Sequence, residues 1–295
     1  MFDTIFSPLQ QLKQASRSQI RIKRDDLIDP YISGNKWRKL KYILQEAKRQ
    51  QKTHLITFGG SYSNHLVATA AACARAGLQS SAFVRGEEVD NEMLMLCKLY
   101  GMELKFTERA SYKDKQFLFK MHYGNDHNAF FVDEGGASLE GTIGCSEIIA
   151  ELPLDTDHIF CAAGTGTTAA GLLKGIQERG LKTQLHVVPV LKGGTFIADE
   201  IALYTQDLSA LHLHTDYHFG GYAKTSPELI RYIQTFTAEE GVLLDPVYTG
   251  KMFFALEDLL RSGAFAKTER IVALHTGGLL GLLGMKDKFK AHTPH

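Results

Sequence analysis

The chain has 295 residues, with 33 basic and 33 acidic side chains that cancel to a formal net charge of zero. This balance excludes the electrostatic footprint of a nucleic-acid or anionic-membrane binder, so any functional cation must act locally. The length allows a large core and two domains. The sequence has no signal-peptide pattern and no apolar run of the roughly 20 residues that a membrane span requires, so we expect a cytoplasmic protein.

Short apolar runs alternate with longer helical patterns along the chain. Strands are expected at residues 54–58, 80–84, 103–106, 129–132, 158–162, 185–190, 212–218 and 270–275. Helices are expected at residues 37–47, 64–76, 91–100, 112–122, 141–151, 167–179, 196–203, 227–240 and 251–261. Apolar strands followed by helices indicate an α/β fold with two doubly wound, mainly parallel sheets. We expect a larger domain of residues 1–45 plus 151–295, and a smaller inserted α/β domain of residues 46–150.

The first functional candidate is Lys36, which follows the flexible run 32–35 and begins a helical pattern. The positive end of the helix dipole and partial burial beside Trp37 both disfavour an ammonium group there. A lysine that becomes neutral can attack an aldehyde, so Lys36 is a candidate Schiff-base residue. The alternative is an ordinary solvated lysine.

A Gly-rich turn follows the strand expected at 54–58 and leads into an alanine-rich helix. Gly59 and Gly60 would allow close approach of a ligand, and Ser63 and Asn64 are residue types that cap helices. Plain capping is one interpretation. In the functional interpretation Asn64 donates its amide to a ring oxygen and Ser63 lies over a substrate.

A second Gly-rich turn joins the strand expected at 158–162 to a helix and contains Gly164, Thr165, Gly166, Thr167 and Thr168. Backbone N–H groups, threonine hydroxyls and a helix N-terminus together form an anion cradle. The turn has no Walker lysine and no dinucleotide fingerprint, so a single phosphate monoester fits best, with a structural turn as the alternative.

The last apolar strand is followed by Thr276. Its hydroxyl is therefore expected where that strand ends, over the candidate site. Tyr222 and Tyr248 lie on turns flanked by glycine or proline, where a tyrosine faces a ligand about as often as it packs.

The cysteines have no metal-ligand spacing, and each lies in an apolar run, which indicates buried thiols in a reducing compartment and no metal site. They are Cys73, Cys97, Cys145 and Cys161.

These segments together resemble the fold-type II pyridoxal-phosphate enzymes, in the branch of 1-aminocyclopropane-1-carboxylate (ACC) deaminase and D-cysteine desulfhydrase. The resemblance keeps the order of the family motifs and covers nearly the whole chain. The matching residues are 23–26, 33–36, 59–60, 63–65, 134–136, 164–166, 246–251 and 275–278. It implies a tryptophan synthase β-like architecture, a cofactor in the cleft between two domains, and a homodimer.

The resemblance also implies the cofactor, pyridoxal 5'-phosphate, and the residues that bind it. Lys36 corresponds to the lysine that bonds the cofactor aldehyde, and Asn64 to the partner of the ring hydroxyl. Residues 164–168 correspond to the phosphate cradle, and Thr276 to the ring-nitrogen partner. Ser63, Tyr222 and Tyr248 correspond to residues that face a small amino-acid substrate.

Two positions distinguish the ACC deaminases from the D-cysteine desulfhydrases within this branch. ACC deaminases have Glu after the second tyrosine and Leu before the last Gly-Gly, whereas this chain has Thr249 and Thr276. That pairing resembles D-cysteine desulfhydrase, which releases pyruvate, ammonia and sulfide by α,β-elimination. Alternatives are ACC deamination, elimination from D-serine or 3-chloro-D-alanine, and a non-catalytic binder of a phosphorylated metabolite. The chain departs from the family in a short connection at residues 85–90 and in an Ala-Ala-Gly start of the phosphate loop.

Overall fold

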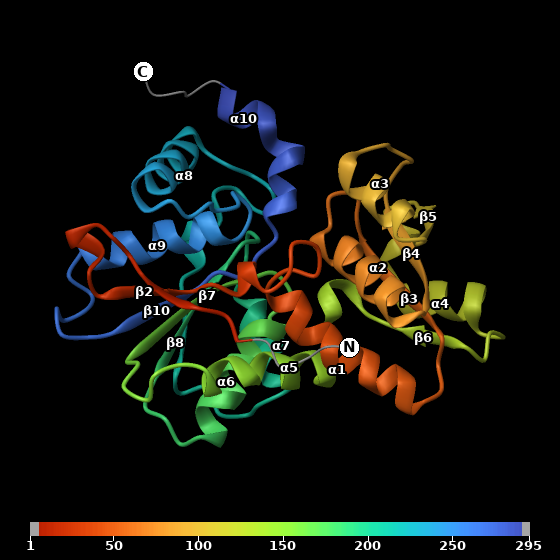
Figure 1. Ribbon diagram of the computed structural model, residues 1–295, viewed down its shortest axis with the longest axis horizontal. Helices are drawn as coiled ribbons and strands as arrows, with labels where there is room; N and C mark the ends of the chain where they lie inside the picture. The colour runs from red at the N-terminus through yellow and green to blue at the C-terminus, as the bar shows by residue number, and fades with distance from the viewer. Residues whose placement is uncertain (1–5, 291–295) are drawn as a thin grey trace.

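Ten strands form two separate sheets in the computed structural model, which describes residues 6–290 (Figure 1). The larger sheet has the order β1-β2-β10-β7-β8-β9, and all its pairs are parallel except β1 with β2. The smaller sheet has the order β5-β4-β3-β6 and is parallel throughout. The expected fold class, two doubly wound and mainly parallel sheets, is confirmed. The boundaries at residues 46 and 150 stay a prediction.

The strands of the larger sheet are β1 (Leu9–Gln11), β2 (Ile20–Lys23), β7 (His158–Ala163), β8 (Gln184–Pro189), β9 (Leu211–Leu213) and β10 (Ile271–Leu274). Those of the smaller sheet are β3 (His54–Gly60), β4 (Gln79–Arg85), β5 (Glu103–Thr107) and β6 (Ala129–Phe131). The α-helices are α1 (Asn35–Arg49), α2 (Asn64–Ala76), α3 (Glu92–Leu99), α4 (Lys115–Tyr123), α5 (Leu139–Ala150), α6 (Thr167–Glu178), α7 (Phe196–Ala202), α8 (Pro227–Glu240), α9 (Thr249–Arg261) and α10 (Lys286–Lys290).

Each sheet buries both faces under helices. Helices α8 and α9 cover one face of the larger sheet, and α5, α6 and α7 cover the other (Figure 1). In the smaller sheet α4 covers one face, while α1, α2 and α3 lie on the other. Sheets buried on both faces explain why the strands are continuous apolar runs.

Helix α1 joins the two halves through very close packing. A Cβ atom on Gly144 of α5 would lie 2.0 Å from the carbonyl oxygen of Arg38 in α1, so only glycine fits there. The buried guanidinium of Arg38 forms two hydrogen bonds with the carboxylate of Asp25, at 2.9 and 3.0 Å, and also pairs with Glu151. These contacts fix the helix that carries Lys36 against the larger sheet.

Two expected elements are wrong in part, and others were not anticipated. Strand β9 ends at Leu213, and residues 215–218 form a 3₁₀ turn where the strand was expected to continue. The helix expected at 112–122 is broken at Asp114, whose carboxylate accepts a hydrogen bond from the N–H of Phe117 and caps α4. Strands β1 and β2 and helix α10 have only three to five residues, too few for a periodic pattern.

Candidate active site

The three Gly-rich turns meet at the carboxyl ends of β3, β7 and β10, where they border a cavity of about 680 Å³ between the two sheets. This is the edge at which doubly wound sheets bind ligands. Most of the site residues expected from the sequence line the cavity: Lys36, Ser63, Asn64, Gly164, Thr165, Gly166, Thr168, Tyr222, Tyr248 and Thr276. Thr167 is buried next to them in the first turn of α6 but does not line the cavity.

Lys36 is the second residue of α1, as the sequence predicts, and the chain enters this helix at Gly34. Gly34 has a φ of +63°, and a Cβ atom there would lie 1.8 Å from the carbonyl oxygen of Thr276. That same carbonyl accepts a hydrogen bond from the N–H of Asn35 at 3.3 Å. The start of the lysine helix and the Thr276 turn therefore hold each other in place.

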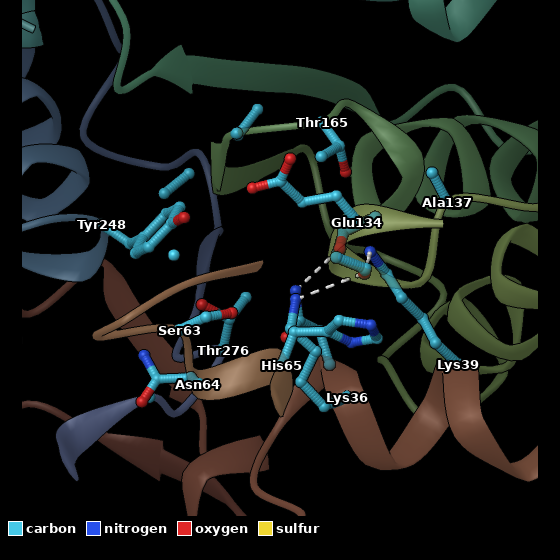
Figure 2. A pocket seen from close by; sticks show the side chains of 18 of the residues that line it. Lys36, Lys39, Ser63, Asn64, His65, Glu134, Ala137, Thr165, Tyr248 and Thr276 are labelled. Carbon is cyan, nitrogen blue, oxygen red and sulfur yellow. Dashed lines mark hydrogen bonds between the residues drawn. The ribbon is translucent and has the colours of Figure 1, made fainter. Parts of the chain in front are cut away.

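The surroundings of Lys36 favour a neutral amine. Its side chain borders the cavity and keeps some exposure, yet the protein around its Nζ lowers the pKa well below the usual value. Burial is the largest cause, and the positive charge of Lys39 is the second. Figure 2 shows both lysines directed at the loop of Glu134, where each donates to the carbonyl oxygen of Gly135. An amine that is neutral near ordinary pH serves as nucleophile and as base.

Asn64 and Ser63 begin α2 at the end of β3 (Figure 2). The N-cap Ser63 makes no side-chain capping hydrogen bond, so plain capping does not account for it. The Oδ1 atom of Asn64 is buried with no hydrogen-bond partner within the part of the chain that is described. A buried amide oxygen without a partner is costly and indicates a missing ligand contact.

His65 follows in the same turn, and its ring is buried. Its Nε2 lies 2.7 Å from the Thr57 hydroxyl, which itself donates to the carbonyl oxygen of Val132. The hydroxyl proton is thus engaged, so Nε2 must carry the imidazole proton and Nδ1 is left with a lone pair. This Nδ1 atom is buried and unpartnered among the described residues. Burial, Lys36 and Lys39 lower the pKa of His65 well below its usual value, so the ring is neutral.

The expected phosphate cradle is the start of α6. Gly166 is its N-cap with a φ of +78°, and a side chain there would be strained. The first amides of a helix have no intrahelical acceptor, so the N–H groups that follow are available to an anion. Hydroxyl groups surround them: Thr165 lies 3.2 Å from Thr167, and Thr168 accepts from the Asn35 amide at 2.9 Å.

The two tyrosines line the cavity side by side, and their rings pack edge-to-face with centroids 6.1 Å apart. Asp245 fixes Tyr248, because its carboxylate accepts hydrogen bonds from the N–H groups of Val247, Tyr248 and Thr249. Burial, together with Tyr222, raises the pKa of Tyr248 well above its usual value. Tyr248 therefore keeps its proton and can donate it.

Thr249 and Thr276, the two positions that the resemblance singled out, differ in placement. Thr276 is nearly buried and lines the cavity. Thr249 is fully buried and does not line it, since its hydroxyl donates to the Asp245 carboxylate at 2.7 Å. Only Thr276 can contact a ligand directly.

Sequence reasoning missed Lys39. Its amine is buried in the same cavity as that of Lys36, and the i, i+3 spacing on one helix face could have revealed it. His65 belongs to the segment 63–65 that matches the family, and the structure pairs its Nε2 with Thr57.

The arrangement fits the group that the resemblance implies. The unpartnered Asn64 oxygen, the amides of the α6 N-terminus and an amine with a depressed pKa border the same cavity. A ring with a hydroxyl, an aldehyde and one phosphate matches these three features. The residues that would hold it are Lys36, Asn64, Thr276 and residues 164–168.

Comparisons with known proteins agree with pyridoxal phosphate as the cofactor. Residues 2–277 match the family model described as "Pyridoxal-phosphate dependent enzyme". The chain is 32% identical to a Pyrococcus horikoshii protein named "Putative 1-aminocyclopropane-1-carboxylate deaminase", over 96% of this chain and 92% of that one. It is 30% identical to the D-cysteine desulfhydrase of Serratia proteamaculans, over 92% of this chain and 91% of that one. A solved structure described as an "ACC deaminase homologue" aligns with a TM-score of 0.87 at 30% identity, covering 99% of this chain and 95% of the other.

Proposed function

The chain belongs to the family of pyridoxal-phosphate-dependent enzymes, and on this premise we propose that it catalyses α,β-elimination on a small D-amino acid. The proposed substrate is D-cysteine, and the products are pyruvate, ammonia and sulfide. The observation that carries this proposal is the cavity itself, where a neutral Lys36 amine and a protonated Tyr248 phenol border the same space.

Lys36 has two tasks in this reaction. Pyridoxal phosphate, when bound, supplies an electron sink that acidifies the Cα–H of an attached amino acid. The Lys36 amine holds the cofactor before the substrate arrives, and once released it is the base that takes the Cα proton. The low pKa that burial and Lys39 give Lys36 makes the neutral amine available for both tasks.

The tyrosines act at the departing group. Sulfur leaves more readily as a thiol than as a sulfide anion, so a proton donor near Cβ assists the step. Tyr248 fits this role because its phenol lines the cavity and carries a proton; burial makes it a weaker acid, so it donates only as negative charge develops on the departing sulfur. Tyr222, at a centroid distance of 6.1 Å, can share the role or hold the substrate carboxylate. Ser63 lines the same cavity and orients the substrate.

Thr276 supports elimination over ring opening. A hydroxyl near the ring nitrogen stabilises positive charge there less than a carboxylate would, which favours prompt loss of a leaving group. The Thr249 hydroxyl is hydrogen-bonded to Asp245 and is not available to the substrate. Its relevance to the choice of reaction is that this position holds no carboxylate.

Side-by-side turnover tests the proposal. The protein reconstituted with pyridoxal phosphate is incubated with D-cysteine, L-cysteine, D-serine and ACC, and sulfide, pyruvate, 2-oxobutanoate and ammonia are measured. We expect sulfide and pyruvate in equal amounts from D-cysteine. Formation of 2-oxobutanoate from ACC, without sulfide from D-cysteine, would overturn the substrate assignment and leave the cofactor assignment in place.

ACC deamination is the second candidate, because several of the relatives carry that name. One relative at 28% identity, from Arabidopsis thaliana, is named for both activities. The same assay separates the two candidates.

A further inference from the structure

A buried lysine outside the cavity holds one of the two tyrosine turns. Lys251, in the first turn of α9, is fully buried and does not line the cavity. Its ammonium nitrogen donates to the carbonyl oxygens of His218 and Gly221, both at 2.8 Å, and to that of Val190 at 3.4 Å. An ammonium has three N–H donors, so these acceptors satisfy all of them.

His218 and Gly221 are the two ends of one turn, and this turn leads directly into Tyr222. The N–H of Gly221 donates to the His218 carbonyl at 3.0 Å, and the N–H of Lys224 donates to the Gly221 carbonyl at 3.1 Å. Each of these carbonyls thus accepts one backbone bond and one bond from Lys251. The amine links both ends of the turn.

The backbone of this segment needs such support. Phe219 and Ala223 have φ values of +51° and +55°, and Gly220 and Gly221 have values of +93° and +118°. A non-glycine residue at positive φ is strained and persists only where its surroundings impose it. Tyr222 lies within this strained run, and although its ring packs edge-on against Tyr248, that contact does not hold the backbone on either side of it.

The third acceptor connects the turn to the sheet. Val190 directly follows β8, and the next residue, Leu191, lines the cavity. The charged group that acts on Lys251 is Asp245, which favours the ammonium form, while burial lowers the pKa of Lys251 to about 8. Asp245 is itself bonded to the backbone that positions Tyr248. One buried anion thus fixes the Tyr248 turn, and one buried cation lies at the Tyr222 turn.

We propose that Lys251 is a positioning residue, which sets Tyr222 over the cavity by binding the carbonyl oxygens of His218, Gly221 and Val190. The inference deepens the proposed function, on which it rests only for the statement that Tyr222 meets the substrate. Removing the amine should let the turn relax and move the phenol, with no direct effect on the cofactor.

A double-mutant cycle tests this, with the holoenzyme and D-cysteine. Lys251→Met keeps the length of the side chain and removes its three donors, while the carbonyl oxygens of His218 and Gly221 each retain a backbone hydrogen bond. We expect kcat/KM to fall about 10- to 100-fold, the range that a misplaced contact produces. In a Tyr222→Ala background the same change should cost less than about twofold. The control Lys224→Met removes an exposed lysine from the same loop and should leave kcat/KM unchanged.

Hydrogen–deuterium exchange gives a readout that does not depend on turnover. In Lys251→Met, peptides covering residues 218–225 should exchange at least roughly tenfold faster, while peptides of α1, α2 and α6 stay unchanged. Equal losses of kcat/KM in both backgrounds, or faster exchange throughout the protein, would overturn the proposal. If Lys251→Met does not fold, Lys251→Gln is tested in the same way, since its amide retains a donor. If the wild-type enzyme does not act on D-cysteine, the proposed function fails, and exchange still decides whether Lys251 holds the turn.

Discussion

Lys36 and Lys39 lie one turn apart on α1, and their amine nitrogens approach the same carbonyl oxygen, that of Gly135, at 3.5 and 3.0 Å. Two ammonium groups in one buried place repel each other, so one is disfavoured. Burial lowers the pKa of both lysines, and the pKa of Lys36 falls further because the charge of Lys39 also acts on it. Lys39 makes the shorter contact with the carbonyl oxygen, and its charge helps to keep Lys36 neutral.

Lys39→Met should raise the pKa of Lys36, because it removes the positive charge that disfavours the Lys36 ammonium. The apoprotein should then react with pyridoxal phosphate about tenfold more slowly near pH 7, and the difference should shrink as the pH rises. Stopped-flow absorbance across a pH series measures this. Lys41→Met is the matched control, since Lys41 lies on the same helix but pairs with Glu147. A reaction rate that falls by the same factor at every pH would contradict an effect of the Lys39 charge on the pKa of Lys36.

Tyr248→Phe should affect substrates differently according to whether their leaving group needs a proton. If the phenol protonates the departing sulfur, its loss should lower kcat for D-cysteine by about 10² to 10⁴-fold. Chloride leaves without a proton, so kcat for 3-chloro-D-alanine should change less than tenfold. Tyr222→Phe, assayed with the same two substrates, shows which tyrosine is the donor. Equal losses on both substrates would assign Tyr248 to binding rather than to proton transfer.

Gly34→Ala should be severely destabilising, because its Cβ atom would lie 1.8 Å from the carbonyl oxygen of Thr276 at a positive φ. We expect a loss of at least about 2 kcal/mol in the free energy of unfolding, above the ~1 kcal/mol of positive φ alone. Gly77→Ala isolates that smaller cost, since Gly77 has a φ of +66° and no atom within 4 Å of the added Cβ. Urea titrations of the two variants measure the free energy of unfolding. Similar losses in both would contradict the predicted steric clash at Gly34.

A histidine cluster away from the cavity should make stability depend on acid pH. The His186 ring bonds His158 at 3.0 Å and His214 at 2.9 Å and stacks on Phe160. Burial, followed by the neighbouring histidines, lowers the pKa of His186 from 6.5 to about 3. Between these values the unfolded chain binds a proton that the folded chain does not, so stability rises with pH across that interval. The slope per group is at most about 1.4 kcal/mol per pH unit.

His186→Phe should flatten this dependence, because phenylalanine keeps the stacking and binds no proton. Thermal unfolding from pH 4 to pH 7 measures it, with His127→Phe, at an exposed histidine outside the cluster, as the control. Parallel pH profiles for His186→Phe and the wild type would contradict the cluster as the cause.

Short sequence patterns, each a turn after an apolar run, predicted the parts of the site that lie at the ends of strands. Each of the turns at Gly60, Gly164 and Thr276 follows an apolar run, and parallel sheets bring such ends to one edge. Lys36 was found because its signal, a lysine at a helix start, is also local. The cysteines were correctly expected to be buried, and all four are free.

What the sequence did not reveal depends on contacts between distant segments. Lys39 resembles a solvated helix lysine until Gly135, 96 positions away, supplies its acceptor. Lys251 belongs to a segment that matches the family, but its acceptors lie 30 to 61 positions upstream. The end of β9 was placed too late because residues 214–218 contain no glycine or proline to mark the point where the backbone turns.

The most direct test of the account is the identity of the lysine that bonds the cofactor. The holoprotein is reduced with borohydride, digested, and the modified peptide is mapped by mass spectrometry, alongside Lys36→Ala and Lys39→Met. We predict that the pyridoxyl group lies on Lys36 in the wild type and in Lys39→Met, and that Lys36→Ala carries none. Modification of Lys39, or no modification of the wild type, would contradict the assignment of Lys36 as the residue on which the chemistry depends.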